Sequence, residues 1–285
     1  MKDTEKTSLG ARADMHLHSV YSDGLNTPEE ICRLAKTRGL QAISITDHDT
    51  MNGDEEKRAA AEKHGLAYVS GWEISAYDED LKLHILGYAC ERGEAYTRFM
   101  QDRKAASLAR AEESVAKLRA LGVPVTMDDV LSFQTDKTAP LHTMHVTRAA
   151  AKYLGLSTRE TYERYLNVGM PANSSIGRPT PKEAIACIHA SGGIASIAHP
   201  GRITLDDEGK ERIVRSLAEC GVDGIEAYYT THTEKETAWF CTLAKELGLY
   251  ITGGSDTHIE DGTHAVGLPV FFMASALQKR LFLGE

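Results

Sequence analysis

Several features common in other protein classes are absent from this 285-residue sequence. No apolar run approaches the roughly 18–20 residues that a membrane-spanning helix needs. Residues 1–9 are polar and of mixed charge, without the apolar core of a secretory signal. There is no internal repeat, low-complexity tract or long linker. Since 42% of the residues are apolar, we expect one large cytoplasmic domain, or one domain with an insertion.

The sequence also lacks the cysteine spacing of disulfide frameworks and zinc sites, and it lacks an excess of positive charge. The five cysteines are odd in number, scattered, and never spaced as CxxC. This argues against a disulfide framework or a cysteine zinc site, and favours buried free thiols in a reducing cytoplasm. The net charge of −9 argues against a uniformly basic surface. We therefore expect no stable binding of duplex nucleic acid, although the net charge does not exclude a local basic pocket.

Short apolar strands alternate with amphipathic helices in residues 11–91 and again in residues 178–285. The expected helix at 28–38, for example, has Thr27 as its N-cap, Pro28 in its first turn and Gly39 as its stop. Residues 92–177 instead show helical patterns with little strand signal, and we expect a helical insertion there. Strands that alternate with helices predict a parallel α/β arrangement on either side of this insertion.

Histidines and carboxylates gather at or just after the ends of the expected strands, where barrels and open α/β sheets build their sites. His16 and His18 are two residues apart on one strand, so their side chains share a face, while Met15 and Leu17 face the packing layer. Asp47 and Asp49 flank a histidine and are expected to orient imidazoles. The candidate metal ligands are His16, His18, Asp23, His48, Glu73, His84, His199, Asp256 and His258.

Each of these residues alone is weak evidence for a metal site. His84, for example, lies among apolar residues and could be an ordinary core histidine. Together the set suits two or three divalent ions, with manganese, iron or zinc expected and magnesium an alternative.

In sequence order, the motifs DxHxH, SDG, TDHDT, GxEIS, HxLGY, AHPGR and GSDxH resemble the PHP family, named for polymerase and histidinol phosphatase. The resemblance runs from Asp14 to about Leu268 and looks closest to the stand-alone phosphoesterases that act on nucleotides. It implies a distorted (β/α)₇ barrel with a helical insertion after the HxLGY segment.

The resemblance also implies roles for individual residues. A first metal position would use His16, His18, Glu73 and Asp256; a second would use Asp23, His48 and His258; and a third would use His84 and His199 with Glu73 as a bridge. The segment from His145 to Arg148 is similar to a His-x-Ala-Arg segment that approaches substrate phosphate. In this chain Thr147 replaces the small residue that the segment usually has. Arg178 matches another phosphate-contacting arginine, and Arg202 is a further candidate. Many relatives carry His where this chain has Tyr229.

The expected activity is hydrolysis of nucleotide phosphomonoesters by metal-activated water, without a covalent phosphoenzyme. The substrates would be 3′,5′-bisphosphates, 5′-mononucleotides or short oligoribonucleotides. Asp256 or His232 is expected to accept or donate protons in the reaction.

Three alternatives stay open at this point. The first is histidinol phosphate as the substrate. The second is C–N bond hydrolysis, for which Lys82 is the nearest candidate for a metal-bridging lysine. The third is a non-catalytic module. The oligomeric state is also open.

Overall fold

The computed structural model describes residues 10–134, 137, 140–261 and 263–284. The chain divides into two compact units. The first contains Met1–Ser75, Leu83–Arg92 and Pro181–Glu285, and the second contains Ala76–Lys82 and Gly93–Thr180. Residues 1–9, in which we expect no secretory signal, lie outside the described residues.

The first unit contains a four-stranded sheet in the order β3-β2-β1-β9. Its strands are β1 (Ala11–Leu17), β2 (Ala42–Ile45), β3 (Ala67–Tyr68) and β9 (Phe271–Met273). Strand β2 runs parallel to both β1 and β3, whereas β9 pairs antiparallel with β1. The C-terminal ends of β1 and β2 therefore lie at the same edge of this sheet.

A five-stranded sheet has the order β4-β5-β6-β7-β8. Its strands are β4 (Gly71–Asp78), β5 (Leu81–Tyr88), β6 (Ile194–Ile197), β7 (Gly224–Tyr229) and β8 (Tyr250–Gly254). Strands β6, β7 and β8 are parallel, and β5 is antiparallel to β6. Single bridges at Leu17–Thr257 and His48–Glu73 link the two sheets. The fold is therefore a mixed α/β fold.

The expectation of parallel strands throughout is wrong at β5 and β9. Only Glu79 and Asp80 separate β4 from β5, and a parallel crossover needs about a dozen residues or more. Strand β9 is three residues long, too short to give a periodic signal in the sequence.

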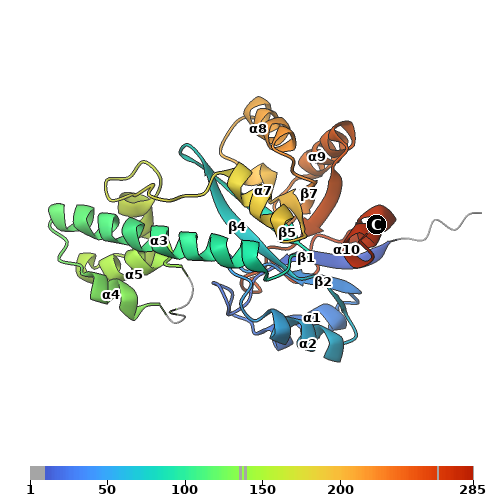
Figure 1. Cartoon of the computed structure of the whole chain (residues 1–285), viewed down its shortest axis with the longest axis horizontal. Helices are drawn as coiled ribbons and strands as arrows, with labels where there is room; N and C mark the ends of the chain where they lie inside the picture. The colour runs from blue at the N-terminus through green and yellow to red at the C-terminus, as the bar shows by residue number, and fades with distance from the viewer. Residues whose placement is uncertain (1–9, 135–136, 138–139, 262, 285) are drawn as a thin grey trace, which may run out of the picture. The chain divides into compact units, whose positions relative to one another are not determined.

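Helices cover the sheets of the first unit, as Figure 1 shows. Helices α1 (Pro28–Thr37) and α2 (Asp54–Lys63) pack against each other, and α2 also packs on β3. Helix α7 (Pro181–Ala190) packs on β6, and α9 (Glu234–Leu247) packs on β7 and β8. The remaining helical elements are η2 (Pro200–Arg202), α8 (Asp207–Glu219) and α10 (Ser275–Phe282).

Local capping sets where several of these helices begin. Thr27 and Glu30 form a reciprocal capping box at the start of α1, and Thr233 and Glu236 do so at α9. Each box satisfies backbone N–H groups that the first helical turn leaves without partners. Asp206 caps α8 by accepting a hydrogen bond from the Gly209 N–H.

The second unit is helical in its longer segment. It contains α3 (Glu94–Ala120), α4 (Met127–Ser132), α5 (Thr143–Leu154), α6 (Thr158–Thr161) and the π-helix η1 (Tyr162–Leu166). These helices share a core of their own, which includes Leu118, Val125, Val130 and Ala149. The unit therefore buries its own apolar surface, as a compact subdomain must.

Two apolar clusters of the first unit pack against β1. Met15 and Leu17 are fully buried, and each belongs to a different cluster of apolar side chains. Both residues were expected to face the packing layer, and they do. Apolar packing around β1 thus holds the strand that carries His16 and His18 in place.

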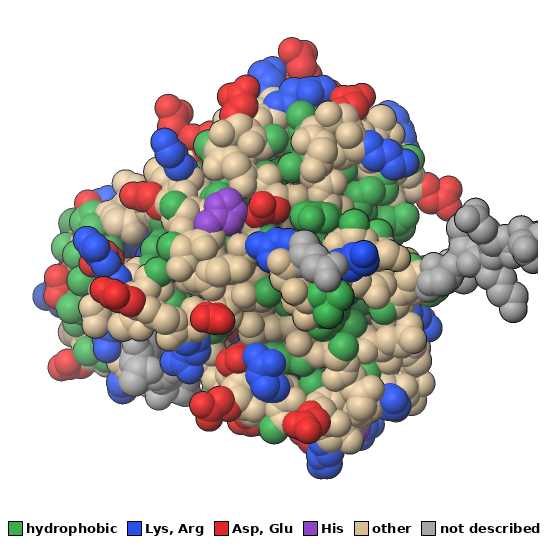
Figure 2. All heavy atoms as spheres, turned by 45° about the vertical axis from the view of Figure 1, so that its right-hand side comes forward, with side chains coloured by type: hydrophobic (Ala, Val, Ile, Leu, Met, Phe, Trp, Pro, Cys, Tyr) green, Lys and Arg blue, Asp and Glu red, His purple; other side chains and the backbone are tan. Residues whose placement is uncertain are grey.

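Surface charge is mixed rather than concentrated. On the face in Figure 2, side chains of both charge signs are interspersed, in keeping with the net charge of −9. Among the described residues, no helix is both long and apolar enough to span a membrane.

Candidate metal centre

The nine expected metal ligands come from strands of the first unit and from the loops that follow them. His16 lies near the end of β1, His18 and Asp23 follow β1, and His48 follows β2. Glu73 and His84 lie on β4 and β5. His199 follows β6, while Asp256 and His258 follow β8. Eight of these residues form three groups whose candidate ligand atoms lie within 4.8 Å of one another, and His199 contacts two members of the third group.

The first group is fully buried and contains His16, His18, Glu73 and Asp256. His18 Nε2 is 3.0 Å from Asp256 Oδ1 and 3.3 Å from Glu73 Oε2. His16 Nε2 is 3.3 Å from the same Glu73 oxygen. Two imidazoles and two carboxylates at such spacing form a donor set for a transition-metal ion.

The second group contains Asp23, His48 and His258, together with His18. His258 Nε2 lies 3.3 Å from Asp23 Oδ1, and the ring of His258 stacks on that of His18 with centroids 4.0 Å apart. The Asp23 side chain is 52% exposed. This group therefore lies at the solvent side of the cluster.

Glu73 is the common member of the remaining contacts. Its Oε1 lies 2.9 Å from His84 Nδ1 and 3.0 Å from His199 Nε2, while its Oε2 lies 2.9 Å from His48 Nδ1. His48, Glu73 and His84 form the third group, with His199 3.2 Å from His84. One carboxylate thus has its two oxygens directed at different sets of imidazoles, which is the geometry of a bridging ligand.

The buried atoms of this cluster need a cation. His16 Nε2, His18 Nε2 and Glu73 Oε2 are buried without a hydrogen-bond partner among the described residues, and so is Asp256 Oδ1. Buried polar atoms are normally satisfied, and each one left without a partner costs free energy. A divalent ion would satisfy imidazole and carboxylate donors together, so the residues fit a metal centre.

Opposite charges inside the cluster shift its pKa values strongly. Burial alone would lower the pKa of His16, but the carboxylates of Glu226, Glu73 and Asp256 raise it well above its ordinary value. Burial would raise the pKa of Glu73, but His48, His84 and His16 lower it well below its usual range. The carboxylates are therefore ionised and favour positive charge beside them, which a bound divalent ion would supply in place of the protons on the imidazoles.

Glu226, the third residue of β7, is a carboxylate beside the cluster that sequence reasoning left without a role. Its Oε1 lies 3.0 Å from His16 Nδ1, and its Oε2 accepts a hydrogen bond from the His199 N–H at 2.7 Å. A carboxylate on the far nitrogen of a ligating imidazole fixes the ring and its tautomer. The signal in the sequence that could have identified Glu226 was its position at the same sheet edge as the expected ligands.

Asp47 and Asp49, expected to orient imidazoles, have other contacts. Asp47 accepts hydrogen bonds from Ser19 and Ser22 and forms an ion pair with Lys57. Asp49 accepts a hydrogen bond from the Ser75 N–H. The Glu226 carboxylate, by contrast, contacts the His16 imidazole from behind.

The backbone around the centre is tightly constrained. A Cβ atom on Gly254 would lie 2.4 Å from Cβ of His16, so only glycine lets β8 approach β1 this closely. Asp49, His199 and Asp256 have positive φ angles of 51°, 29° and 52°. Such angles are unfavourable for these residue types and concentrate at functional sites.

Arg202 and His232, expected to bind phosphate and to handle protons, lie close to this centre. Arg202 Nη1 is 3.2 Å from both Asp256 Oδ2 and the Tyr229 hydroxyl. His232 Nδ1 donates to the Ala227 carbonyl, and its Nε2 accepts from the Gly201 N–H, each at 3.0 Å. Both ring nitrogens of His232 therefore bind the backbone.

The other expected phosphate-binding residues belong to the second unit. His145 and the exposed Arg148 lie on α5. Arg178 donates to Asn173 Oδ1 at 2.8 Å, and its guanidinium lies over the Tyr77 ring, 4.3 Å from the ring centroid. Its Nη1 is buried without a hydrogen-bond partner among the described residues.

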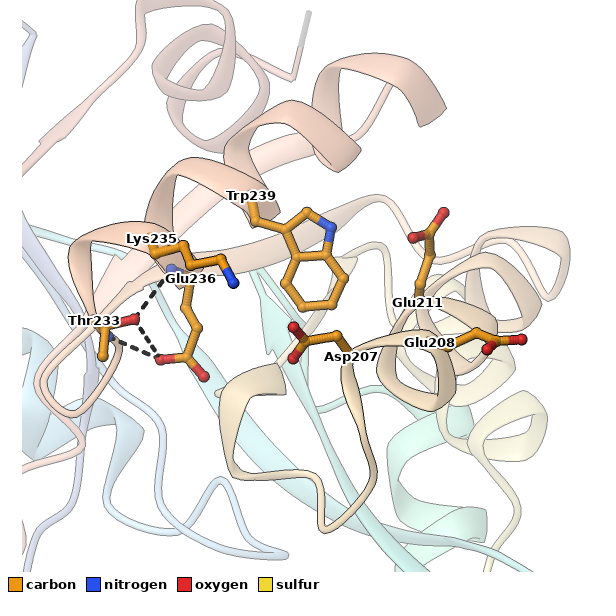
Figure 3. A pocket seen from close by; sticks show the side chains of 7 residues that line it. All are labelled: Asp207, Glu208, Glu211, Thr233, Lys235, Glu236 and Trp239. Carbon is orange, nitrogen blue, oxygen red and sulfur yellow. Dashed lines mark hydrogen bonds between the residues drawn. The ribbon is translucent and has the colours of Figure 1, made fainter.

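A separate cavity of about 630 Å³ lies between α8 and α9 and shares no residue with the ligand cluster. Figure 3 shows Trp239 in this cavity with the Asp207 carboxylate beneath its indole ring, and Glu208 and Glu211 to one side. Four of the seven lining residues are acidic. This lining would repel a phosphate, so we do not place a phosphorylated substrate there.

An α/β fold with buried imidazoles and carboxylates gathered at its strand ends defines a metal-dependent hydrolase. The chain belongs to the PHP family, since the model of the PHP domain matches residues 14–260. It is a metal-dependent phosphoesterase of that family, and the resemblance inferred from the motifs is confirmed.

Three relatives cover most of the chain. A 5′-3′ exoribonuclease of Haemophilus influenzae is 30% identical over 89% of this chain and 92% of its own. A phosphoribosyl 1,2-cyclic phosphate 1,2-diphosphodiesterase of Eggerthella lenta is 31% identical over 86% and 93%. A 3′,5′-nucleoside bisphosphate phosphatase of Chromobacterium violaceum is 30% identical over 87% of both chains.

Two solved structures have the same fold. A Chromobacterium violaceum protein described as an amidohydrolase, with bound sulfate and no metal, matches with a TM-score of 0.75 and 29% identity over 90% of both chains. A Bifidobacterium adolescentis protein, provisionally described as a metal-dependent phosphoesterase, matches with a TM-score of 0.74 and 26% identity over 96% of this chain and 98% of its own.

Proposed function

We propose that this enzyme hydrolyses phosphomonoesters of nucleotides: 3′,5′-bisphosphates, 5′-mononucleotides or short oligoribonucleotides. The observation that carries the proposal is the cluster around Glu73, in which imidazoles and carboxylates from both sheets converge. The names of the relatives support a nucleotide or a related phosphorylated sugar as the substrate class.

We assign metal ligation to the nine residues expected from the sequence, with Glu73 as the bridge. The first position would be held by His16, His18, Glu73 and Asp256, and the second by Asp23, His48 and His258. Glu73, His84 and His199 would hold the third. We also propose that the two sheets together form the distorted (β/α)₇ barrel, with 92–177 as its insertion.

Divalent ions bound there would lower the pKa of a coordinated water and neutralise charge on the phosphoryl oxygens. Manganese, iron or zinc suits the imidazole-rich donor set, with magnesium as an alternative. The protein's own contribution is to hold these donors rigidly, because strands that carry them pack against the apolar clusters of the first unit.

Asp256 is our candidate for handling protons beside the phosphate. Its Oδ1 faces His18 and its Oδ2 faces Arg202 and Tyr229. His232 is the weaker candidate, because its two nitrogens already bind backbone groups. A proton on His232 could leave or arrive only by breaking one of these bonds.

For phosphate binding we propose His145, Arg148, Arg178 and Arg202. A guanidinium presents paired N–H groups that match phosphate oxygens, which lysine cannot reproduce. The first three are assigned on the sequence resemblance. Arg202 is additionally supported by its contact with Asp256.

A substrate panel tests this proposal. The metal-reconstituted enzyme would be assayed for phosphate release from 3′,5′-bisphosphates, 5′-mononucleotides and short RNA, with histidinol phosphate and a cyclic phosphodiester beside them. We expect the highest kcat/KM among the nucleotides. Faster turnover of histidinol phosphate would overturn the substrate assignment and leave the metal centre standing.

The same panel includes amide and cyclic amide substrates, since one structural neighbour is described as an amidohydrolase. The nearest candidate for a bridging lysine was Lys82, but its side chain is exposed, and Glu73 already directs both of its oxygens at the imidazoles. We therefore expect no C–N hydrolysis. We further propose that the enzyme works in the cytoplasm, because its five cysteines are all free.

A further inference from the structure

One lysine of the first unit is buried, although it lies on a helix whose other charged residues are mostly at the surface. Lys57 lies on α2 and is 1% exposed. Its Nζ lies 2.5 Å from Oδ2 of Asp47, which is also fully buried. Lysine is almost never buried unless its charge is paired, so this ion pair needs a structural or functional reason.

The Asp47 carboxylate links α2 to the loop that follows β1. Its Oδ1 accepts hydrogen bonds from the Ser19 N–H and from the Ser22 hydroxyl, both at 2.7 Å. Its Oδ2 accepts one from the Ser19 hydroxyl, also at 2.7 Å. One carboxylate therefore holds two points of this loop while Lys57 neutralises its charge.

That loop carries Asp23, one of the three residues proposed for the second metal position. The N–H groups of Ser22 and Gly24 both donate to the Ser19 carbonyl at 3.1 Å, so the loop folds back on Ser19. Asp23 Oδ1 faces His258 Nε2 at 3.3 Å and His18 Nδ1 at 3.9 Å. Half of the Asp23 side chain is exposed, so its placement depends on the loop rather than on core packing.

Asp47 is itself fixed at the end of β2. Its backbone carbonyl accepts from the Glu73 N–H at 3.1 Å, next to the bridge between His48 and Glu73. Asp47 thus ties the loop that carries the half-exposed Asp23 to the segments that carry His48 and Glu73. Without a cation beside it, this buried carboxylate would lack the partner that its charge requires.

We propose that Lys57 is a positioning residue for the second metal position: by pairing with Asp47 it holds the Ser19–Asp23 loop so that Asp23 meets His48 and His258. The inference rests on the proposed ligand set. Lys57 is not itself a proposed ligand; it pairs with Asp47 and lies over the Tyr21 ring of the same loop, 5.6 Å from the ring centroid. The first position, built from His16, His18, Glu73 and Asp256, takes no ligand from the Ser19–Asp23 loop.

Calorimetric titration of the metal-free full-length protein with Mn²⁺ tests the proposal. In Lys57→Met, the weaker class of sites should lose about 10–100-fold in affinity, the usual effect of removing a supporting partner. We assign this class to the second position, because its Asp23 side chain is half-exposed whereas the first group is buried. The tighter class should be unchanged. Lys63→Met is the matched control, since Lys63 lies on the same helix with a side chain that is 67% exposed.

A second variant separates the charge effect from simple loss of packing. In Lys57→Met/Asp47→Asn, the neutral amide no longer needs a cation but still offers an oxygen to Ser19 and Ser22. We expect this double variant to recover part of the Mn²⁺ affinity that Lys57→Met loses. If Lys57→Met unfolds, Ser22→Ala takes its place, because it removes only one contact of Asp47.

The outcomes separate this inference from the proposed centre. If the wild-type protein binds no Mn²⁺, the ligand set itself is wrong. If the wild type binds ions and Lys57→Met binds them as Lys63→Met does, the positioning role is wrong. Lys57→Met should also add nothing to the effect of Asp23→Asn on the weaker sites, since both act on the same ligand.

Discussion

The phenolic hydroxyl of Tyr229 donates a hydrogen bond to Oδ2 of Asp256 at 2.8 Å. The other oxygen of the carboxylate, Oδ1, lies 3.0 Å from His18 Nε2. Tyr229 is 1% exposed, so this bond is made away from water. The two oxygens of Asp256 are thereby divided between the imidazoles on one side and Tyr229 with Arg202 on the other.

Replacing Tyr229 with Phe should loosen the Asp256 carboxylate. The ring would still fill its place beside His199, but the hydroxyl that fixes the carboxylate rotation would be gone. We expect about tenfold weaker Mn²⁺ binding at the first position and a similar loss in kcat, which is the lower end of what such supporting contacts contribute. Titration calorimetry and steady-state kinetics measure the two effects.

Tyr228→Phe is the control for this substitution. Tyr228 precedes Tyr229 on β7, is only partly buried, and packs against Phe271 rather than the centre. It should keep wild-type metal binding and kcat. Equal behaviour of the two variants would show that the Tyr229 hydroxyl has no role at Asp256.

Glu226→Gln should weaken metal binding more severely. The carboxylate touches His16 Nδ1 at 3.0 Å and accepts from the His199 N–H at 2.7 Å. An amide has only one oxygen, and its NH₂ group would face a donor. We expect a loss of about 10–100-fold in metal affinity, measured by competition with a chromophoric chelator.

Asp223→Asn provides the comparison for Glu226→Gln. Asp223 also makes a carboxylate–histidine contact, 2.8 Å from His189 Nε2, but neither residue belongs to the cluster. Its loss should leave metal affinity unchanged. A wild-type metal affinity in Glu226→Gln would mean that the contact between Glu226 and His16 Nδ1 does not contribute to metal binding.

Much of this architecture follows from local signals in the sequence. The helix expected at 28–38 is α1, which begins at Pro28 and ends at Thr37, one residue early. Thr27 caps its start, and Gly39, with a φ of 74°, follows its end. The ligand positions were also accessible, because the ends of neighbouring strands meet at one edge of a sheet.

The contacts that support the ligands depend on distant parts of the chain. Glu226 is 210 positions from His16, and nothing local marks it as an imidazole partner. Lys57 occupies a position on a highly charged helix where a lysine is ordinarily solvated. Only the docking of α2 against the β1 loop shows that it is buried, and no periodicity in the sequence encodes that docking.

Metal removal should lower stability without changing the fold class. A ligand that binds only the native state adds about 2.7 kcal/mol to the free energy of unfolding when its free concentration is 100 times Kd. We therefore expect EDTA to lower Tm and to abolish phosphate release, and Mn²⁺ to restore both. Melting curves at several Mn²⁺ concentrations measure the dependence.

Glu73→Gln tests whether this stabilisation comes from the cluster. Because Glu73 contacts ligands of every proposed position, its variant should lose turnover and show a Tm that no longer responds to Mn²⁺. Full activity in Glu73→Gln would contradict its role as the bridge. A Tm that still rises with Mn²⁺ would place the stabilising ion elsewhere.

His145 should be neutral at pH 7. Burial and the nearby charges of His142 and Arg148 lower the pKa of His145 to about 4. Its Nδ1 accepts a hydrogen bond from the His142 N–H at 3.0 Å, which puts the ring proton on Nε2. An imidazole in this state can donate to a phosphate oxygen but carries no charge. NMR titration of the ring should give a midpoint near 4 and resonances of the Nε2–H tautomer.

The depressed pKa of His145 also predicts the sign of a stability change with pH. In the unfolded chain the imidazole titrates near 6.5, whereas the folded protein takes up this proton only near pH 4. Between these values the unfolded state binds more protons, so the His145 contribution to stability is lost as pH falls through this window. Urea unfolding at pH 7 and pH 5 should show a smaller drop in His145→Asn than in the wild type. An equal drop, or an NMR midpoint at 6.5 or above, would mean that His145 is protonated freely and meets phosphate as a cation.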